Sequence, residues 1–223
     1  MSQKRIGIGF VGGGFITRFH IQSMIGVRNC DVLGVMSRTR SSAEESASLA
    51  RTIGVGDAKV YNTVTEMVEE PSIDALWICA PNFTRLEIME EIYNAIDSGK
   101  GELIGVTCEK PLGRNVKEAK KVLELTQKAG LLDGYLENQV FAPSVTRGKE
   151  IIWSRGAKTT GRPYLARAAE EHSGPHMPWF WEGELQGGGV LNDMMCHSVE
   201  EARFMLTEPG KKRESLTPKS VNA

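Results

Sequence analysis

Residues 6–17 read IGIGFVGGGFIT, and they give the clearest indication of the fold. A short apolar run, Ile6–Val11, leads directly into three glycines, and a helix-like run begins at Phe15. Strand, glycine turn and helix in this order are the context in which a Gly-x-Gly-x-x-Gly fingerprint cradles the diphosphate of a dinucleotide. In this chain, Gly12 and Gly14 hold the first two positions of that fingerprint and Thr17 holds the third.

Each residue of the turn has an expected role. Gly12 makes the tight turn, Gly14 lets the diphosphate approach the backbone, and the N–H groups of Phe15 and Ile16 at the helix start bind phosphate. Thr17 replaces the usual glycine or alanine, so we expect slightly looser packing of strand on helix and a hydroxyl within reach of a phosphate oxygen. The alternative is a glycine-rich turn that binds no ligand.

The first 140 residues alternate short apolar runs with longer amphipathic ones, which predicts a doubly wound parallel α/β sheet of the Rossmann type over residues 1–140. Strands are expected at 5–11, 31–36, 60–61, 75–79, 102–107 and 132–137, and helices at 15–25, 42–51, 64–69, 83–98 and 116–129. Capping pairs that predict helix starts are Ser41 with Glu44, Thr63 with Glu66, and Asn115 with Glu118.

The alternation of short apolar and longer amphipathic runs ends at about Phe141. A helix is expected at 144–153 and a strand at 164–169, followed by a loop rich in glycine, proline, histidine and tryptophan. We interpret residues 141–223 as the beginning of an α+β domain that the chain leaves incomplete, with 209–223 as a loop.

Composition excludes several classes of function. Lys and Arg number 27 against 28 Asp and Glu, so there is no basic field for nucleic acid. The four cysteines are scattered without a Cys-x-x-Cys pair, which predicts reduced thiols in a cytoplasmic protein and no metal site. No apolar run approaches the roughly 20 residues that span a bilayer, so we expect no membrane association.

The end of the second strand bears on the choice of nucleotide. An acid there pairs with the ribose hydroxyls of NAD, but residues 35–40 read VMSRTR. Ser37 can donate a hydrogen bond, and Arg38 can pair with a 2′-phosphate and stack on adenine. The segment favours NADP, with NAD possible. The alternative is that Arg38 and Arg40 are solvated loop cations.

Three further segments carry a family resemblance. Residues 109–111 read EKP after a predicted strand, residues 187–197 read GGGVLNDMMCH, and residues 80–82 read APN. Together with the glycine turn they resemble the Gfo/Idh/MocA family of NAD(P)-dependent oxidoreductases. The chain departs from the family at Arg85, where a histidine is common, and in its length, since members are normally much longer.

The resemblance implies site residues. Lys110 would hydrogen-bond the reacting hydroxyl, and His197 is favoured as the general base, although either could take the proton. Asp193, expected one helical turn from His197, would hold substrate or orient the imidazole. Cofactor contacts are expected from Ala80, Pro81, Asn82, Glu109 and Lys110, with Glu109 anchoring its turn. The alternatives are a surface lysine at Lys110, and helix capping by Asp193 beside a structural histidine.

Substrate contacts are expected from Asn192 and from His176 and Trp179, because indole rings stack on the apolar faces of sugars. The loop that contains His176 and Trp179 could equally be a segment that packs between domains. The predicted function is hydride transfer between NADP, or NAD, and a secondary alcohol of a sugar, polyol or related cyclic substrate. Alternatives are transient use of bound NAD(H) for epimerisation or glycoside cleavage, and a non-catalytic NAD(P)-sensing regulator. The full-length protein is expected to be a homo-oligomer.

Overall fold

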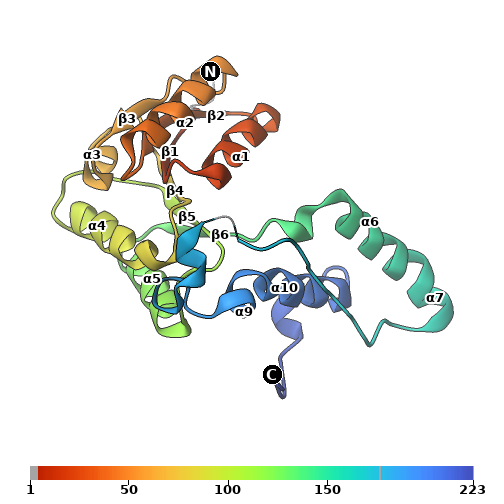
Figure 1. Ribbon diagram of the computed structural model, residues 1–223. Helices are drawn as coiled ribbons and strands as arrows, with labels where there is room; N and C mark the ends of the chain where they lie inside the picture. The colour runs from red at the N-terminus through yellow and green to blue at the C-terminus, as the bar shows by residue number, and fades with distance from the viewer. Residues whose placement is uncertain (1–4, 176, 223) are drawn as a thin grey trace. The chain divides into compact units, whose positions relative to one another are not determined.

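The computed structural model describes residues 5–175 and 177–222, which form two compact units (Figure 1). The first unit contains the residues up to Leu136 together with Glu182–Gly187. The second contains Glu137–Trp181 and the residues from Gly188 onward. Residues 182–187, which the sequence analysis places in the second domain, therefore pack with the first unit.

The first unit is built on a six-stranded sheet in the order β3-β2-β1-β4-β5-β6, and every pairing is parallel. The chain order reverses at β1, which pairs with β2 on one side and β4 on the other. The predicted doubly wound sheet is confirmed. The strands are β1 (Ile6–Val11), β2 (Cys30–Met36), β3 (Lys59–Tyr61), β4 (Ala75–Ile78), β5 (Gly105–Glu109) and β6 (Leu132–Leu136).

One strand lies later than predicted. β5 was expected from Glu102, but it begins at Gly105. The preceding Ile104 donates its N–H to the carbonyl of Asp74, the residue before β4, at 2.7 Å, and this bond leads the chain into β5. The later end brings Glu109 into the strand, so that Lys110 is the first residue beyond it.

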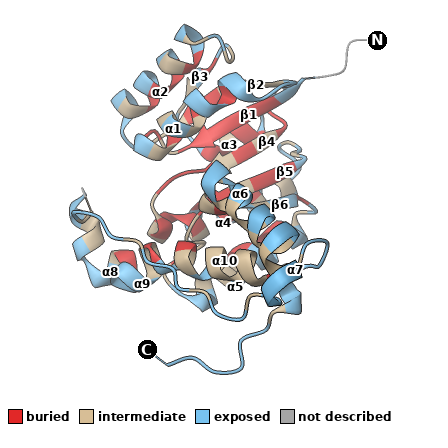
Figure 2. Cartoon of the chain, turned by 90° about the vertical axis from the view of Figure 1, so that its right-hand side faces the viewer, coloured by how far each residue is buried: buried red, intermediate tan, exposed pale blue. Residues whose placement is uncertain are grey.

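Helices cover both faces of the sheet. α1 (Phe15–Ser23) and α2 (Arg40–Thr52) bury Ile21 and three alanines of α2 against one face. α3 (Val64–Val68), α4 (Arg85–Asp97) and α5 (Val116–Lys128) cover the other face. Figure 2 shows the buried residues concentrated along β1, β4 and β5. The central strands are thus fixed from both sides, and the loops at their ends have a rigid base.

Side chains cap two of the helices as predicted. Thr63 Oγ1 accepts the N–H of Glu66 at 3.1 Å, and Asn115 Oδ1 accepts that of Glu118 at 3.0 Å. The cap predicted at Ser41 is wrong, because α2 begins at Arg40 and its N-cap residue makes no side-chain cap. Arg40 Nε instead donates to the Glu44 carboxylate at 3.0 Å. That carboxylate is the group that would have to bond the backbone N–H of Ser41 in a capping box.

The second unit is helical in the part that the structure describes. α6 (Pro143–Ile151) continues through a π-helical turn, Ile152–Gly156, into α7 (Ala157–Thr160), and Trp153 Nε1 donates to the carbonyl of Met205 at 2.9 Å. The other helices are α9 (Gly189–Asp193) and α10 (Met195–Leu206). The short α8 (Gly183–Gln186) belongs to the first unit.

The strand predicted at 164–169 is wrong, because the structure has these residues in an irregular segment. A strand needs a partner for its backbone hydrogen bonds, and no residue described in the second unit is in a strand. Among the helices of residues 5–175 and 177–222, none is both long enough and apolar enough to cross a membrane.

The two capping sites give a matched test of the fold. We predict that Thr63→Ala lowers the free energy of unfolding by about 1 kcal/mol, because the N–H of Glu66 loses its acceptor. Ser41→Ala should change it by less than about 0.5 kcal/mol, since Ser41 is exposed and caps nothing. Urea unfolding followed by circular dichroism measures both, and equal losses would contradict the assignment.

Candidate active site

Three loops meet at the carboxyl edge of the sheet. Residues 12–14 follow β1, residues 79–84 follow β4, and residues 110–115 follow β5. Because β1, β4 and β5 are adjacent and parallel, their carboxyl ends lie side by side at the point where the strand order reverses. The structure therefore brings together the glycine turn, the APN loop and the EKP turn, which the sequence separates by about a hundred residues.

The glycine turn approaches the APN loop closely. Gly12 has a φ of +113°, and a Cβ on it would lie 2.8 Å from the backbone nitrogen of Ala80. Gly14 is the N-cap residue of α1, and a Cβ there would meet no atom within 4 Å. Phe15 begins α1 and is 77% exposed, and no acidic residue lies in the first turn. The open helix end suits an anion.

Thr17 closes this turn from inside. Its side chain is fully buried, and Oγ1 donates to the carbonyl of Gly12 at 2.9 Å. The expectation of a hydroxyl within reach of phosphate is wrong, because that hydrogen bond directs the hydroxyl at the carbonyl. The threonine side chain, which is larger than the usual glycine or alanine, is accommodated in the core. Its hydrogen bond to Gly12 stabilises the turn.

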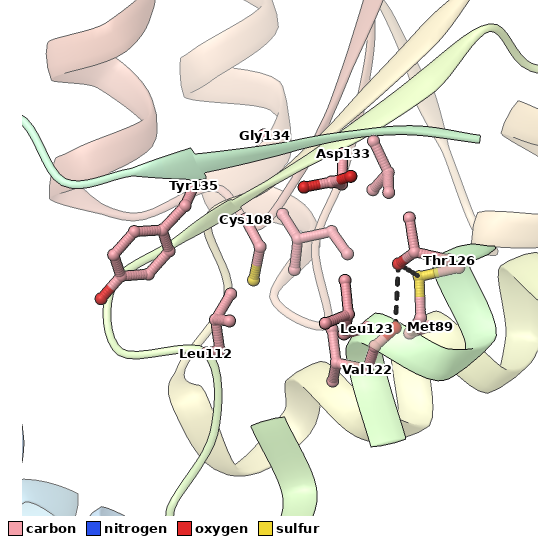
Figure 3. A pocket seen from close by; sticks show the side chains of 11 residues that line it. Met89, Cys108, Leu112, Val122, Leu123, Thr126, Asp133, Gly134 and Tyr135 are labelled. Carbon is pink, nitrogen blue, oxygen red and sulfur yellow. Dashed lines mark hydrogen bonds between the residues drawn. The ribbon is translucent and has the colours of Figure 1, made fainter. Parts of the chain in front are cut away.

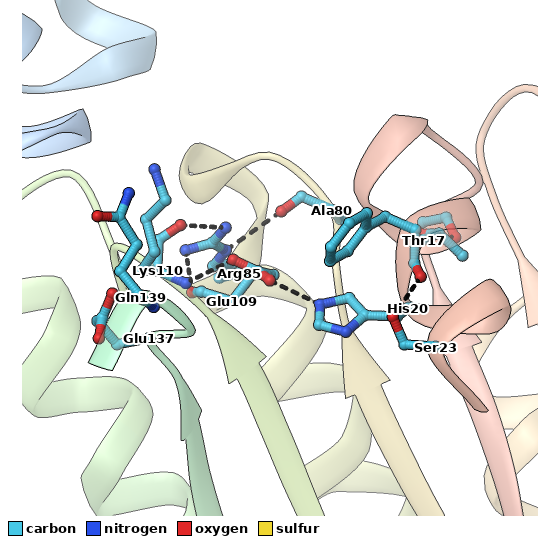
Figure 4. A network of polar contacts seen from close by, with 11 residues as sticks. Thr17, His20, Ser23, Ala80, Arg85, Glu109, Lys110, Glu137 and Gln139 are labelled. Carbon is cyan, nitrogen blue, oxygen red and sulfur yellow. Dashed lines mark hydrogen bonds and ion pairs between the residues drawn. The ribbon is translucent and has the colours of Figure 1, made fainter. Parts of the chain in front are cut away.

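Arg85 ties two of the loops together. It is the first residue of α4, is 4% exposed, and its guanidinium contacts the carbonyls of Ala80 at 3.2 Å, Lys110 at 3.1 Å and Glu109 (Figure 4). The planar fork of arginine can satisfy several carbonyls at once, which a histidine cannot. Arg85, where the family commonly has a histidine, therefore holds the peptide carbonyls before and after the Lys110 side chain as well as that of Ala80.

Glu109 links the EKP turn to the first helix. One carboxylate oxygen lies 2.7 Å from Nε2 of His20, and the other accepts the N–H of Lys110 at 3.1 Å. His20 packs edge-on to Trp77, with ring centroids 5.2 Å apart, and Glu109 is 5% exposed. Glu109 thus anchors the turn, and the Lys110–Pro111 peptide bond that follows is cis. His20 was not among the predicted site residues, because its position in α1 gives no indication of a contact with Glu109, 89 residues later.

Asn82 has one unsatisfied atom. It is 2% exposed, and its Nδ2 donates to the carbonyl of Gln186 at 2.8 Å. Its Oδ1 is buried without a hydrogen-bond partner among the described residues. An orphaned acceptor of this kind is costly unless a ligand or water satisfies it.

Residues 182–187 are held on the first unit by Arg114. Its Nη1 donates to the carbonyl of Glu184 at 2.9 Å. Gly187 has a φ of +94°, and a Cβ there would lie 2.3 Å from the carbonyl oxygen of Arg114. A glycine is therefore required at position 187 by close packing on the backbone of Arg114.

The two arginines after β2 differ in their surroundings. Arg40 bonds Asn62 Oδ1 at 2.8 Å as well as Glu44, so its guanidinium supports the loop. Arg38 is exposed, and its Cζ lies 5.7 Å from the centroid of the Phe83 ring. Ser37 beside it is half-buried. A planar cation over an aromatic ring forms a stacking surface next to the APN loop.

The second unit contains a buried histidine–carboxylate pair. Nδ1 of His197 hydrogen-bonds Glu137, and the two residues are 5% and 4% exposed. α9 ends at Asp193 and α10 begins at Met195, with Met194 between them in αR backbone. The imidazole is therefore oriented by Glu137, which sequence reasoning missed because it lies 60 residues from His197.

The expected substrate residues lie in the second unit. Asn192 and Asp193 are half-buried at the end of α9. Trp179 is also half-buried and stacks on Phe180, with ring centroids 3.8 Å apart. His176 lies outside the described residues.

The cysteines near the site are buried thiols. Burial raises the pKa of Cys108 to about 11, and burial likewise raises the pKa of Cys79. Burial thus disfavours the thiolate, which is the reactive form of a cysteine, at both positions.

A small cavity lies beside Cys108, between β5, β6 and α5 (Figure 3). Its volume is about 50 Å³, and its walls include Leu112, Val122 and Tyr135. Ligand pockets are roughly 300–1,000 Å³. This cavity is a packing feature of the sheet and not a substrate site.

The role of Arg85 can be tested by a conservative change. We predict that Arg85→Lys lowers the free energy of unfolding by about 2–4 kcal/mol, because one ammonium cannot reach three carbonyls. Amide hydrogen exchange should accelerate at residues 80–84 and 109–113. Arg28→Lys, at an exposed position, is the control. Unchanged exchange in both loops would contradict the assignment.

The chain matches known proteins along most of its length. Residues 6–134 match a model described as an oxidoreductase family with an NAD-binding Rossmann fold, GFO/IDH/MocA, and residues 156–218 match the GFO/IDH/MocA C-terminal domain. It is 29% identical over 202 residues to the 1,5-anhydro-D-fructose reductase of Ensifer adhaerens, covering 90% of this chain and 56% of that protein. It is 25% identical to the myo-inositol 2-dehydrogenase of Thermotoga maritima, covering 90% and 55%.

A solved structure is also similar. GenD2 from gentamicin A biosynthesis, in complex with NAD, superposes with a TM-score of 0.73 at 25% identity, covering 94% of this chain and 56% of that one. The chain thus spans about half the length of the proteins it matches. Since the first family model alone matches residues 6–134 of 223, the chain belongs to the Gfo/Idh/MocA oxidoreductase family.

Proposed function

We propose that this protein transfers a hydride between NADP(H) and a secondary alcohol of a sugar, polyol or related cyclic substrate. The observation that carries the proposal is the convergence of the glycine turn, the APN loop and the EKP turn at the carboxyl edge of β1, β4 and β5. In open α/β sheets, ligands bind at this switch point. The names of relatives that act on anhydrofructose and myo-inositol support the substrate class.

The residues at this edge fit a dinucleotide. Gly14 and the first N–H groups of α1, at Phe15 and Ile16, would hold the diphosphate. Ala80, Pro81 and Asn82 would line the nicotinamide end, where the unsatisfied Oδ1 of Asn82 can accept a hydrogen bond from a ribose hydroxyl or the carboxamide. Glu109 and Lys110 would line the same end of the dinucleotide site. When bound, the nicotinamide supplies the hydride donor or acceptor at its C4.

Ser37 and Arg38 would select NADP. Arg38 is exposed beside the Phe83 ring, so adenine can stack on its guanidinium while the 2′-phosphate pairs with its N–H groups. No acid is present at residues 35–40 to repel that phosphate.

Nucleotide preference tests this assignment. We predict tighter binding of NADP+ than of NAD+, and that Arg38→Ala weakens NADP+ about 10- to 100-fold by removing a charge-assisted pair. NAD+ binding should change by less than about threefold. Arg40→Ala, at a residue already paired with Glu44 and Asn62, is the control. Fluorescence titration measures all three, and a preference for NAD+ in the unaltered protein would refute the NADP assignment.

Two side chains, those of Lys110 and His197, would act on the hydroxyl group of the substrate and on its proton. In oxidation the alcohol C–H leaves as hydride, and the hydroxyl proton must pass to a base. Lys110 would hydrogen-bond the reacting oxygen, since it directly follows β5 on a turn fixed by Arg85 and Glu109. His197 would accept the proton, Asp193 and Asn192 would hold substrate hydroxyls, and Trp179 and His176 would contact the ring.

The lysine assignment has a direct test in the whole protein. We predict that Lys110→Ala lowers kcat by about 100-fold or more while the Kd for NADP+ changes by less than about threefold, because the ammonium acts on the reacting oxygen. Lys117→Ala, at an exposed position of α5, is the control. Turnover of a panel of sugars and polyols is followed by nicotinamide absorbance. Unchanged turnover in the Lys110 variant would remove the assigned role.

A further inference from the structure

The second unit contains a group of carboxylates around His197 that the proposed chemistry does not yet use. Glu137 follows β6, Glu170 lies in the irregular segment before the aromatic loop, and Glu201 lies one helical turn beyond His197 on α10. Carboxylates in such a cluster repel one another, so their arrangement around one imidazole calls for a physical reason.

Glu137 is the member that contacts the ring. Its carboxylate accepts the N–H of Gln139 at 3.0 Å and that of Val140 at 3.4 Å, and it meets Nδ1 of His197. An ionised carboxylate only accepts hydrogen bonds, so the proton of that contact lies on Nδ1. The lone pair of a neutral imidazole is then on Nε2. Among the described residues, Nε2 of His197 has no hydrogen-bond partner.

The other two carboxylates of the cluster, Glu170 and Glu201, have different surroundings. Gln139 Nε2 donates to Glu170 at 2.8 Å, which stabilises that carboxylate independently of the histidine. Burial raises the pKa of Glu201, and the nearby Glu137 and Glu170 raise it further. Glu201 therefore interacts with the other two carboxylates through space, whereas Glu137 contacts Nδ1 of His197 directly.

We propose that Glu137 is a positioning residue: it fixes the proton of His197 on Nδ1 and thereby presents Nε2 as the acceptor for the substrate's hydroxyl proton. The proposal rests on the proposed function for the identity of the reaction. Its geometric part, the tautomer, stands on the contact between Glu137 and His197 alone.

Glu137→Gln tests the proposal with little change in shape. The carboxylate accepts from the N–H groups of Gln139 and Val140 and from Nδ1, and an amide has one oxygen for these three donors. Where the NH2 group takes the place of Oε1, it faces Nδ1 and the imidazole proton must move to Nε2. With this wrong tautomer, kcat should fall about 100- to 10,000-fold while KM changes less than about threefold, as happens when an amide replaces the carboxylate of a serine-protease triad. Glu137→Asp keeps the carboxylate and should recover at least tenfold of that loss.

The matched control is Glu170→Gln, a carboxylate of the same cluster that bonds Gln139 and not the histidine. It should keep kcat within about threefold. Nitrogen-15 NMR of the imidazoles, with the His197 signals identified by their loss in His197→Asn, reads the tautomer without any turnover. The unaltered protein and Glu170→Gln should show the proton on Nδ1, and Glu137→Gln should show it on Nε2.

These readouts separate the two claims. Absence of turnover on every alcohol tested, with Nδ1 protonated as expected, would refute the proposed function and leave the positioning of His197 supported. A proton on Nε2 in the unaltered protein would overturn the positioning proposal. So would a kcat in a folded Glu137→Gln variant, checked by thermal melting, that matches the Glu170→Gln control.

Discussion

A buried guanidinium, that of Arg85, holds the carboxyl ends of β4 and β5 in one arrangement. A charge removed from water is stable only when its hydrogen-bonding groups are satisfied, and here the backbone itself supplies the acceptors. The carbonyls of Ala80, Glu109 and Lys110 must therefore keep their positions relative to one another. Lys110 is the first residue after β5, and Arg85 contacts the carbonyls of both Glu109 and Lys110. The backbone from which the Lys110 side chain extends is therefore held in place.

The same principle operates at the other links of this site. Glu109 is buried because His20 and the N–H of Lys110 satisfy its two oxygens. His20 lies on α1, which begins at the glycine turn, so the hydrogen bond between His20 and Glu109 connects that turn to the turn that contains Lys110. In the second unit, Glu137 is buried against His197 and two backbone N–H groups. In each case a polar group that would be costly to bury alone fixes the backbone or ring beside it.

Much of the fold could be predicted from the sequence because its signals are local. The run of Ile6–Thr17 contains strand, turn and helix within twelve positions, and Thr63 and Asn115 mark helix starts three residues from their partners. The strand predicted at 164–169 failed because strand formation depends on a partner elsewhere in the chain. Ser41 failed as a cap because a neighbouring arginine competes for Glu44.

The candidate site divides in the same way. Its motifs could be found because glycines, EKP and the final histidine are contiguous patterns. The residues that support them could not, since His20 and Glu109 are 89 positions apart and Glu137 and His197 are 60 apart. Arg85 could be noticed only as a departure from a family pattern. Its contacts with two loops depend on the parallel register of β4 and β5, which no local pattern specifies.

The proposed chemistry requires that the carboxyl edge of β1, β4 and β5 bind a dinucleotide with its nicotinamide beside Lys110. A crystal structure of the protein with bound NADP+ tests this most directly. We expect the diphosphate on the N–H groups that follow Gly14, a hydrogen bond from the nucleotide to Oδ1 of Asn82, and the nicotinamide next to the Lys110 ammonium. A nucleotide bound elsewhere, or one whose nicotinamide lies away from Lys110 and Asn82, would contradict it.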